Sequence, residues 1–163
     1  MTTKERMVRS QTSSDLGERK DGELGDIDIV RATGMVAQSN PTGVRLWRLK
    51  YSNDLAERLP AIEELAEMLR LRGVDEHQAK ELSITAVRHY VDDICKPCGG
   101  RGHDNLEGTP FLSDEPCVVC RGTGKKPIVH VSEWSVWLED TISRLERDVA
   151  SSLMRKLSGE MDF

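Results

Sequence analysis

The chain has 163 residues, of which 28 are acidic and 23 basic, and its formal net charge at pH 7 is -5. A domain of this length can bury a hydrophobic core, and an aromatic content of only 4% indicates that Leu, Ile, Val and Ala build most of it. No stretch approaches the roughly 18 apolar residues of a membrane span, and the N-terminal segment lacks the apolar region of a secretory signal. We therefore expect a cytoplasmic protein with no membrane partner.

The N-terminal residues 1–28 are polar and show no hydrophobic periodicity. They are rich in Ser, Thr, Asp, Glu and Gly, a composition that cannot bury enough apolar surface to order a chain. We expect a disordered or weakly ordered arm, followed by one helical domain over residues 29–163. That domain opens with the most basic segment of the chain, residues 29–52, which contains no acidic residue. Its basic residues are Arg31, Arg45, Arg48 and Lys50.

Residues 51–94 have the apolar period of two amphipathic helices. Pro60 suits the first turn of the first helix, and Gly73 offers its C-terminal stop. The second helix begins at Asp75, which with Gln78 resembles a capping box, and keeps its period up to the first cysteine. The apolar faces consist of Ile62, Leu65, Ala66 and Leu69, then Ala79, Leu82, Ala86, Val87, Tyr90, Val91 and Ile94. We predict that the two helices form an antiparallel hairpin.

All four cysteines lie in one region, residues 95–124, in two C-x-x-C-x-G-x-G repeats. They are Cys95, Cys98, Cys117 and Cys120. The 18 residues between the two pairs fall within the spacing of zinc sites, and thiols in a reducing cytosol rarely persist as disulfides. Four thiolates complete the tetrahedral coordination of zinc and leave no position for a catalytic water. We predict one structural Zn2+.

The residues around the cysteines agree with a metal site better than with a redox site. A thioredoxin-like dithiol is disfavoured because no βαβ pattern surrounds either pair. His103 and His130 are candidate ligands only if a cysteine is displaced, and we expect His103 on the loop surface and His130 just before a helix. The repeats contain glycines that can take a positive φ, which a Cβ would disfavour. These are Gly100, Gly102, Gly122 and Gly124.

A long C-terminal helix is predicted to begin after Ser132, a suitable N-cap, and to run to about Ser158. Trp134 and Trp137 are expected in the core or on a docking surface rather than as a base-stacking pair. The apolar stripe recurs every three or four residues and consists of Trp134, Leu138, Ile142, Leu145, Val149 and Leu153. The predicted fold is mainly α: a helical hairpin, a zinc-bound loop insert with four cysteine ligands, and this long helix.

Nucleic-acid binding by an acidic protein requires a localised basic face. The knuckle loops offer Arg101, Arg121, Lys125 and Lys126 as candidate DNA contacts. The last helix offers Arg144, Arg147 and Arg155, which share one side with Ser151. The alternative for this helical stripe is a solvated face with ordinary ion pairs, since Glu146 and Asp148 lie nearby. The basic segment, residues 29–52, is a third candidate.

Signatures of enzymes are missing from the sequence. It contains no Walker loop, no H-E-x-x-H, no G-x-S-x-G and no dinucleotide fingerprint after a strand. The acidic pairs Glu63–Glu64 and Asp92–Asp93 are adjacent residues, which diverge on a helix. We expect neither catalysis nor a small-molecule substrate.

Four segments follow one another along the chain: DIDIVRATGMVAQSNPTG, AVRHYVDDIC, CKPCGGRG and CVVCRGTG. Their order resembles the lambdoid phage late-gene antitermination protein Q family, and the resemblance covers roughly residues 26–126. It implies a transcription regulator that binds late-promoter DNA and host RNA polymerase with its sigma factor, so that the polymerase reads through terminators in the host bacterial cytoplasm. The four cysteines match the family's zinc ligands, whereas the link that follows them is shorter than the family leads us to expect. That difference leaves the helix that reads DNA unassigned.

Two other functions share parts of this pattern. A zinc-knuckle nucleic-acid-binding module without antitermination activity has the same residue-level features. A chaperone-type zinc module is the other alternative, because J-domain co-chaperones use the same repeat. Such co-chaperones usually have four repeats, whereas this chain has two and lacks a His-Pro-Asp tripeptide.

Overall fold

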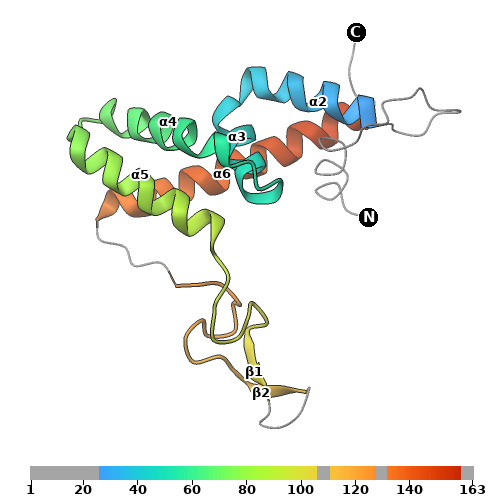
Figure 1. Ribbon diagram of the computed structural model, residues 1–163, viewed down its shortest axis with the longest axis vertical. Coiled ribbons are helices and arrows are strands. Elements are labelled where there is room, and N and C mark those ends of the chain that lie inside the picture. Colours follow the sequence, from blue (N-terminus) through green and yellow to red (C-terminus); the bar gives the residue numbers. More distant parts are fainter. Residues whose placement is uncertain (1–25, 106–110, 128–131, 159–163) are drawn as a thin grey trace, which may run out of the picture.

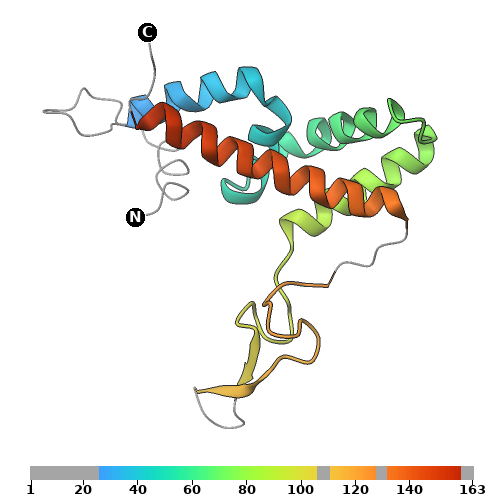
Figure 2. The same cartoon turned by 180° about the vertical axis from the view of Figure 1, so that it is seen from behind.

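The structure, a computed structural model, describes residues 26–105, 111–127 and 132–158. It is mainly helical, as predicted, and its helices form one body from which a cysteine-rich loop projects (Figures 1 and 2). The helices are α2 (Asp26–Ser39), α3 (Pro41–Tyr51), the short 3-10 helix η1 (Leu55–Glu57), α4 (Arg58–Arg70), α5 (Glu76–Val91) and α6 (Glu133–Leu157). In the loop, strands β1 (His103–Asn105) and β2 (Leu112–Pro116) pair antiparallel, with His103 opposite Pro116. No helix of the described ranges combines the length and the apolar character needed to cross a membrane.

The predicted hairpin is confirmed as α4 and α5, which pack antiparallel (Figure 1). Gly73 turns the chain with φ +86°, and the Asp75 carboxylate accepts hydrogen bonds from the backbone N–H groups of His77 and Gln78 at 3.0 and 3.3 Å. The expectation that α5 continues to Cys95 is wrong, because the helix ends at Val91. Beyond Val91 the chain leaves the helix, and the Cys95 N–H donates a hydrogen bond to the carbonyl of Gly124.

Helices α2 and α3 cover most of the basic segment, residues 29–52, for which no secondary structure was predicted. In α2, Ile29, Ala32 and Val36 lie on one buried face. Asn40 then separates the helices: it caps α3 by accepting a hydrogen bond from the Gly43 N–H at 2.9 Å, and Pro41 follows in the first turn. Asn followed by Pro is a helix-start signal, so α3 was within reach of sequence analysis. The expected arm, residues 1–28, lies outside the described residues up to residue 25, and α2 begins at Asp26.

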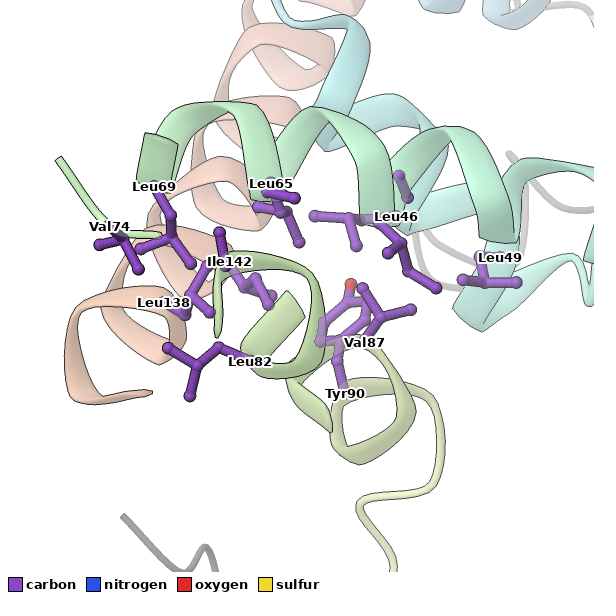
Figure 3. Packing of buried hydrophobic residues seen from close by; sticks show 14 residues of the cluster. Leu46, Leu49, Leu65, Leu69, Val74, Leu82, Val87, Tyr90, Leu138 and Ile142 are labelled. Carbon is purple, nitrogen blue, oxygen red and sulfur yellow. The ribbon is translucent and has the colours of Figure 1, made fainter. Parts of the chain in front are cut away.

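Helix α6 joins two hydrophobic cores. Its predicted N-cap is confirmed, since Ser132 and Ser135 form a reciprocal capping box. Leu138 and Ile142 belong to the first core, where they meet α3, α4 and α5 (Figure 3). Val149 and Leu153 belong to the second core, against α2 and α3. The predicted stripe of α6 therefore faces the protein along its whole length, while Trp134 and Trp137 pack half-buried at the edge of the first core.

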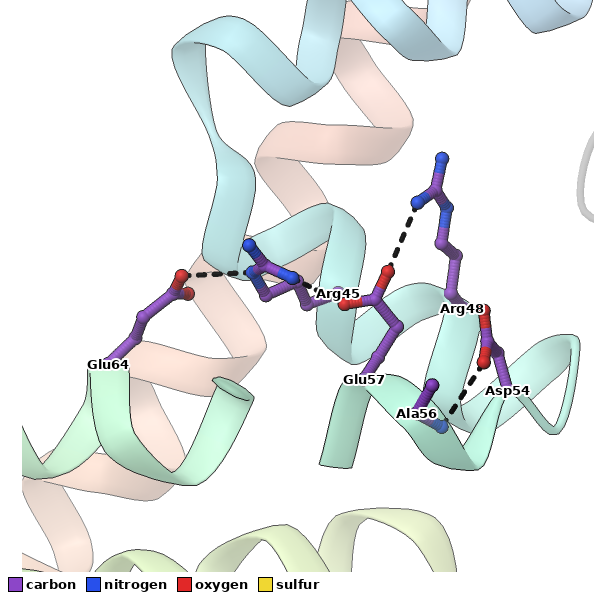
Figure 4. A network of polar contacts seen from close by, with 6 residues as sticks. All are labelled: Arg45, Arg48, Asp54, Ala56, Glu57 and Glu64. Carbon is purple, nitrogen blue, oxygen red and sulfur yellow. Dashed lines mark hydrogen bonds and ion pairs between the residues drawn. The ribbon is translucent and has the colours of Figure 1, made fainter. Parts of the chain in front are cut away.

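Three of the four cations of the basic segment pair with carboxylates of neighbouring elements. The Arg45 guanidinium contacts Glu57 at 2.5 Å and Glu64 at 2.9 Å, and Arg48 contacts Glu57 at 3.1 Å (Figure 4). Lys50 pairs with Asp93 at 2.7 Å. These pairs tie α3 to η1, α4 and the end of α5. Because three of its four cations, Arg45, Arg48 and Lys50, already have carboxylate partners, this segment is the weakest of the three candidate phosphate-binding faces.

Candidate metal centre

The two knuckles close each other. We call residues 94–127 the cysteine loop, with a first knuckle at residues 95–102 and a second at residues 117–124. The Cys95 N–H donates to the Gly124 carbonyl at 2.9 Å, and the Cys117 N–H donates to the Gly102 carbonyl at 2.7 Å. The first cysteine of each knuckle is thus held by the last glycine of the other. This reciprocity explains why the C-x-x-C-x-G-x-G pattern occurs twice, since neither copy can complete its hydrogen bonds alone.

The repeated glycines are required by both conformation and space. Positive φ is confirmed for all four predicted glycines, which are Gly100, Gly102, Gly122 and Gly124. A Cβ on Gly102 would lie 2.4 Å from the Gly122 carbonyl oxygen. The equivalent Cβ on Gly124 would lie 2.3 Å from the Gly100 carbonyl oxygen. The knuckles therefore approach each other closely enough to exclude any side chain at these two positions.

The four thiols form a buried tetrad. Their Sγ atoms all lie within 4.8 Å of one another, and Cys98 and Cys120 are 3.6 Å apart. A zinc ion with tetrahedral Zn–S bonds of about 2.3 Å would separate its sulfur ligands by about 3.8 Å. All four cysteines are at most 5% exposed and are free thiols. The donor set and its spacing fit a four-coordinate metal ion.

The local environment also favours a cation between the thiols. Burial and hydrogen bonds to the other three thiols raise the pKa of Cys95. At Cys98 the effect of burial is outweighed by the backbone N–H groups of Gly102 and Gly100 and by the neighbouring thiols, and the pKa is lowered. The Gly124 N–H donates to the Cys120 sulfur at 3.3 Å. Neighbouring thiols cannot all ionise in this buried space unless a positive ion offsets their charge.

His103 takes no part in the tetrad. His103 is half-buried in β1, and its Nδ1 lies 3.0 Å from the Ser113 carbonyl oxygen and 3.1 Å from that of Glu115. A carbonyl oxygen only accepts, so Nδ1 carries the proton and braces the β-hairpin. The metal-binding group among the described residues consists of the four cysteines alone. His130 lies outside the described residues.

The predicted cations of the knuckles do not all face the same way. Arg121, Lys125 and Lys126 line a cleft of about 1150 Å³ between the cysteine loop, α5 and α6. Arg101 is exposed elsewhere on the loop, where its Nε donates to the Cys98 carbonyl at 2.9 Å. Arg88 joins the cleft from α5 and was not singled out from the sequence. The cleft also contains carboxylates of α5 and α6, so its charge is mixed.

The predicted basic stripe of α6 is exposed. Arg144, Arg147 and Arg155 are exposed, and the ion pairs found between described residues involve none of them. Glu146, which with Asp148 lies near the stripe along the chain, accepts a hydrogen bond from Tyr51. At 1.5 Å per residue, the stripe spans about 16 Å. The lining of the cleft includes none of the three arginines, but Arg147 lines a small pocket that shares Ser143 and Glu146 with the cleft. The structure does not bring the two sets of cations into one site.

A small polar anchor joins the cysteine loop to the helical body. Lys50 pairs with Asp93, whose carbonyl accepts the Lys126 N–H at 2.7 Å. The Lys126 carbonyl in turn lies 3.0 Å from Nε2 of His89. The Lys50 ammonium also stands 4.4 Å from the centre of the Tyr90 ring, a cation–π contact. This anchor could not be predicted from the sequence, because its residues are distant along the chain and belong to no motif.

Comparison with known proteins adds no relatives. No protein-family model matches the chain, and no curated protein or solved structure matches it either. The function is therefore inferred from the residues and their geometry.

Proposed function

We propose that this protein is a phage transcription antitermination factor that binds late-promoter DNA and host RNA polymerase with its sigma factor. The observation that carries the proposal is the pair of interlocked knuckles inserted between a helical hairpin and a long helix, in the order that resembles the Q family. The thiol tetrad supports a structural role for its metal, because four protein ligands leave no open position for substrate. Soft thiolate ligands in a tetrahedral set favour zinc.

The proposed DNA contacts are seven exposed cations of the cysteine loop and of α6. They are Arg101, Arg121, Lys125, Lys126, Arg144, Arg147 and Arg155. The metal would act indirectly, by fixing the knuckle backbones that carry the first four of these residues. Phosphate contacts of this kind supply affinity and position but little sequence information. Binding should therefore weaken steeply with added salt, as counterions compete for the phosphates.

The proposal is tested by transcription in vitro with bacterial RNA polymerase holoenzyme on a template with the cognate late promoter and a downstream terminator. Wild-type protein should increase read-through, and a Cys98→Ser/Cys120→Ser variant should not. An Arg144→Gln/Arg147→Gln variant, which leaves the knuckles intact, should retain its metal but act at higher protein concentration. Unchanged termination with wild-type protein, with zinc present, would refute the proposal.

A chaperone-type zinc module is the second candidate, and one observation favours it. Val118 and Val119, between the cysteines of the second knuckle, are 87% and 48% exposed, and exposed apolar side chains are what unfolded chains bind. Suppression of the aggregation of a model substrate by wild-type protein, lost in a Val118→Ser/Val119→Ser variant, would identify this function. An antitermination factor should give the same aggregation with or without the two valines.

A further inference from the structure

Charge is segregated along the cysteine loop. Its described cations all lie at the knuckle end and are Lys96, Arg101, Arg121, Lys125 and Lys126. Its described carboxylates all lie in the β-hairpin and are Asp104, Asp114 and Glu115. All eight residues are exposed, and none forms an ion pair with another described residue. The loop therefore has a basic end, next to the helical body, and an acidic end that projects away from it.

The helical body leaves the acidic end of the loop uncovered, whereas Arg121, Lys125 and Lys126 of the basic end line the cleft beside α5 and α6. The cysteine loop extends from the ends of α5 and α6, with the β-hairpin at its far end (Figures 1 and 2). The polar anchor at Lys50 and Asp93 fixes only its base. A second molecule can thus approach the hairpin without meeting the helices of the first.

We propose that two copies of this chain pair through their cysteine loops in an antiparallel, two-fold arrangement. In that orientation the basic end of each loop faces the acidic end of the other, and the favourable contact occurs twice. A parallel arrangement would place like charges together, which is unfavourable. The loop's own charge pattern therefore selects both the partner and the orientation.

Exposed apolar side chains provide contact area within the same surface. Val118 at the basic end is 87% exposed, and Leu112 at the start of β2 is 45% exposed. Antiparallel pairing brings the knuckle valines of one copy toward the hairpin of the other. The loop is small, so the dimer belongs to the class of weak, salt-sensitive interfaces that bury less than about 1,200 Å².

Pairing and phosphate binding would compete, because both use the cations of the knuckles. This consequence links the dimer to the proposed function, although the dimer itself rests only on the charges of the loop. Nucleic acid should therefore dissociate the dimer.

The test is sedimentation velocity of the full chain with its metal bound, at low and high ionic strength, with charge-reversed variants. One variant reverses the hairpin (Asp114→Lys/Glu115→Lys), and a second reverses the knuckle (Lys125→Glu/Lys126→Glu). A control reverses two exposed cations of the helical body (Arg58→Glu/Lys80→Glu). Each variant changes the net charge by four units, upward for the hairpin variant and downward for the knuckle variant and the control.

Wild-type protein and the control should dimerise at low ionic strength and dissociate as salt is added. Each loop variant alone should bind itself at least about tenfold more weakly. A one-to-one mixture of the two loop variants should recover dimers, because the unchanged basic end of the hairpin variant then meets the unchanged acidic end of the knuckle variant. Recovery in the mixture requires both variants to be folded. Bound metal is measured for each variant. If either loop variant has lost its metal, a second pair of variants, Asp104→Lys and Lys96→Glu, takes the place of the first pair.

Three results would overturn the proposal. The first is wild-type protein that stays monomeric at low ionic strength up to roughly 1 mM. The second is self-association of both loop variants as strong as that of the wild type, which would place the interface elsewhere. The third is a mixture of metal-loaded loop variants that remains monomeric. None of these results bears on read-through, so the proposed function is tested separately.

Discussion

Gly100 and Gly124 are in contact across the two knuckles, so closely that a Cβ on Gly124 would stand 2.3 Å from the Gly100 carbonyl oxygen. Replacing Gly124 with Ala should push the knuckles apart and weaken metal binding by about 10- to 100-fold, the usual effect of disturbing the surroundings of metal ligands. Competition with a chromophoric chelator measures the change.

Gly73 provides the matched control for that substitution. It also has a positive φ, +86°, but a Cβ there would meet nothing within 4 Å. Gly73→Ala should cost about 1–2 kcal/mol of folding free energy from backbone strain alone and leave metal affinity unchanged. Equal metal affinities for the two variants would show that the close approach of the knuckles is unimportant.

Arg121 occupies a position that favours glycine. Its φ is +51°, and the equivalent position of the first knuckle is Gly99, with φ +58°. Arg121→Gly should stabilise the metal-bound loop by about 1 kcal/mol, because it removes left-handed strain. The same change removes a proposed phosphate contact, so DNA affinity should fall. The slope of the logarithm of the binding constant against the logarithm of the salt concentration should decrease in magnitude by about 1.

Chelator-induced unfolding and DNA titrations at several salt concentrations separate these two effects. Lys125→Gln serves as a control, since it removes one charge from an exposed lysine without changing a strained backbone position. It should weaken DNA binding similarly and leave stability unchanged. A loss of stability in Arg121→Gly would contradict the assignment of strain.

Glu57 should make the stability of the helical body depend on pH. Burial acts to raise its pKa, but hydrogen bonds and charge from Arg45 and Arg48 outweigh burial and lower it below the ordinary value of 4.5. A lowered pKa stabilises the fold above pH 4.5, and the contribution disappears as pH falls through the folded-state value. Glu57→Gln should therefore destabilise by about 1–2 kcal/mol at pH 7, with a smaller difference from wild type in acid.

Urea unfolding followed across pH tests this prediction. Glu67→Gln is the control, because Glu67 is half exposed and its ion pair among the described residues is with Arg70, one turn away on the same helix. Exposed pairs of this kind contribute little. The free energies of unfolding of wild type and Glu57→Gln could instead differ by the same amount down to the acid limit. The charge of Glu57 would then not be what stabilises the network.

Lys50 should control how firmly the cysteine loop is held. Lys50→Met removes the pair with Asp93, whose side chain and that of Lys50 are 21% and 16% exposed. A partly buried charged hydrogen bond is worth about 1.5–3 kcal/mol, so hydrogen exchange at the Lys126 amide should accelerate by at least about tenfold. Lys80→Met, on the exposed face of α5, should leave that exchange rate unchanged. If the exchange rate of the Lys126 amide is unchanged in both variants, the pair between Lys50 and Asp93 does not hold the cysteine loop.

Metal removal should unfold the cysteine loop and spare the helices. The thiol tetrad is a separate buried cluster that shares no residue with the two helical cores. Chelation should therefore abolish protection from exchange in the loop while helical circular dichroism changes little. Cooperative loss of all helical signal on chelation would show that the body depends on the metal.

The parts of the fold that follow from local sequence could be predicted. The hairpin, α6 and its cap follow from period and start signals, and the cysteine tetrad follows from spacing. Helix α2 could not be predicted in the same way, because its buried face is short and contains Thr33, whose hydroxyl is satisfied only by the Ile29 carbonyl of the same helix. The neutralisation of Arg45 and Arg48 also depends on residues brought near by folding.

The candidate site divides along the same line. The ligands and the glycines follow from the repeat itself, whereas the mutual closure of the knuckles needs both copies in space. The sequence alone could list the cations of the cysteine loop. It could not show that Lys125 and Lys126 face a cleft while Arg101 does not, because side-chain direction depends on how the knuckles fold.

The position of α6 after the cysteine loop has a consequence for biosynthesis. A ribosome delivers both knuckles before it delivers the helix that completes both hydrophobic cores, so metal capture can precede folding of the body. Until α6 emerges, α2 to α5 expose the apolar faces that it will cover. The nascent chain is therefore expected to carry a folded metal-bound loop on an unfinished helical scaffold, and to depend most on molecular chaperones at that stage.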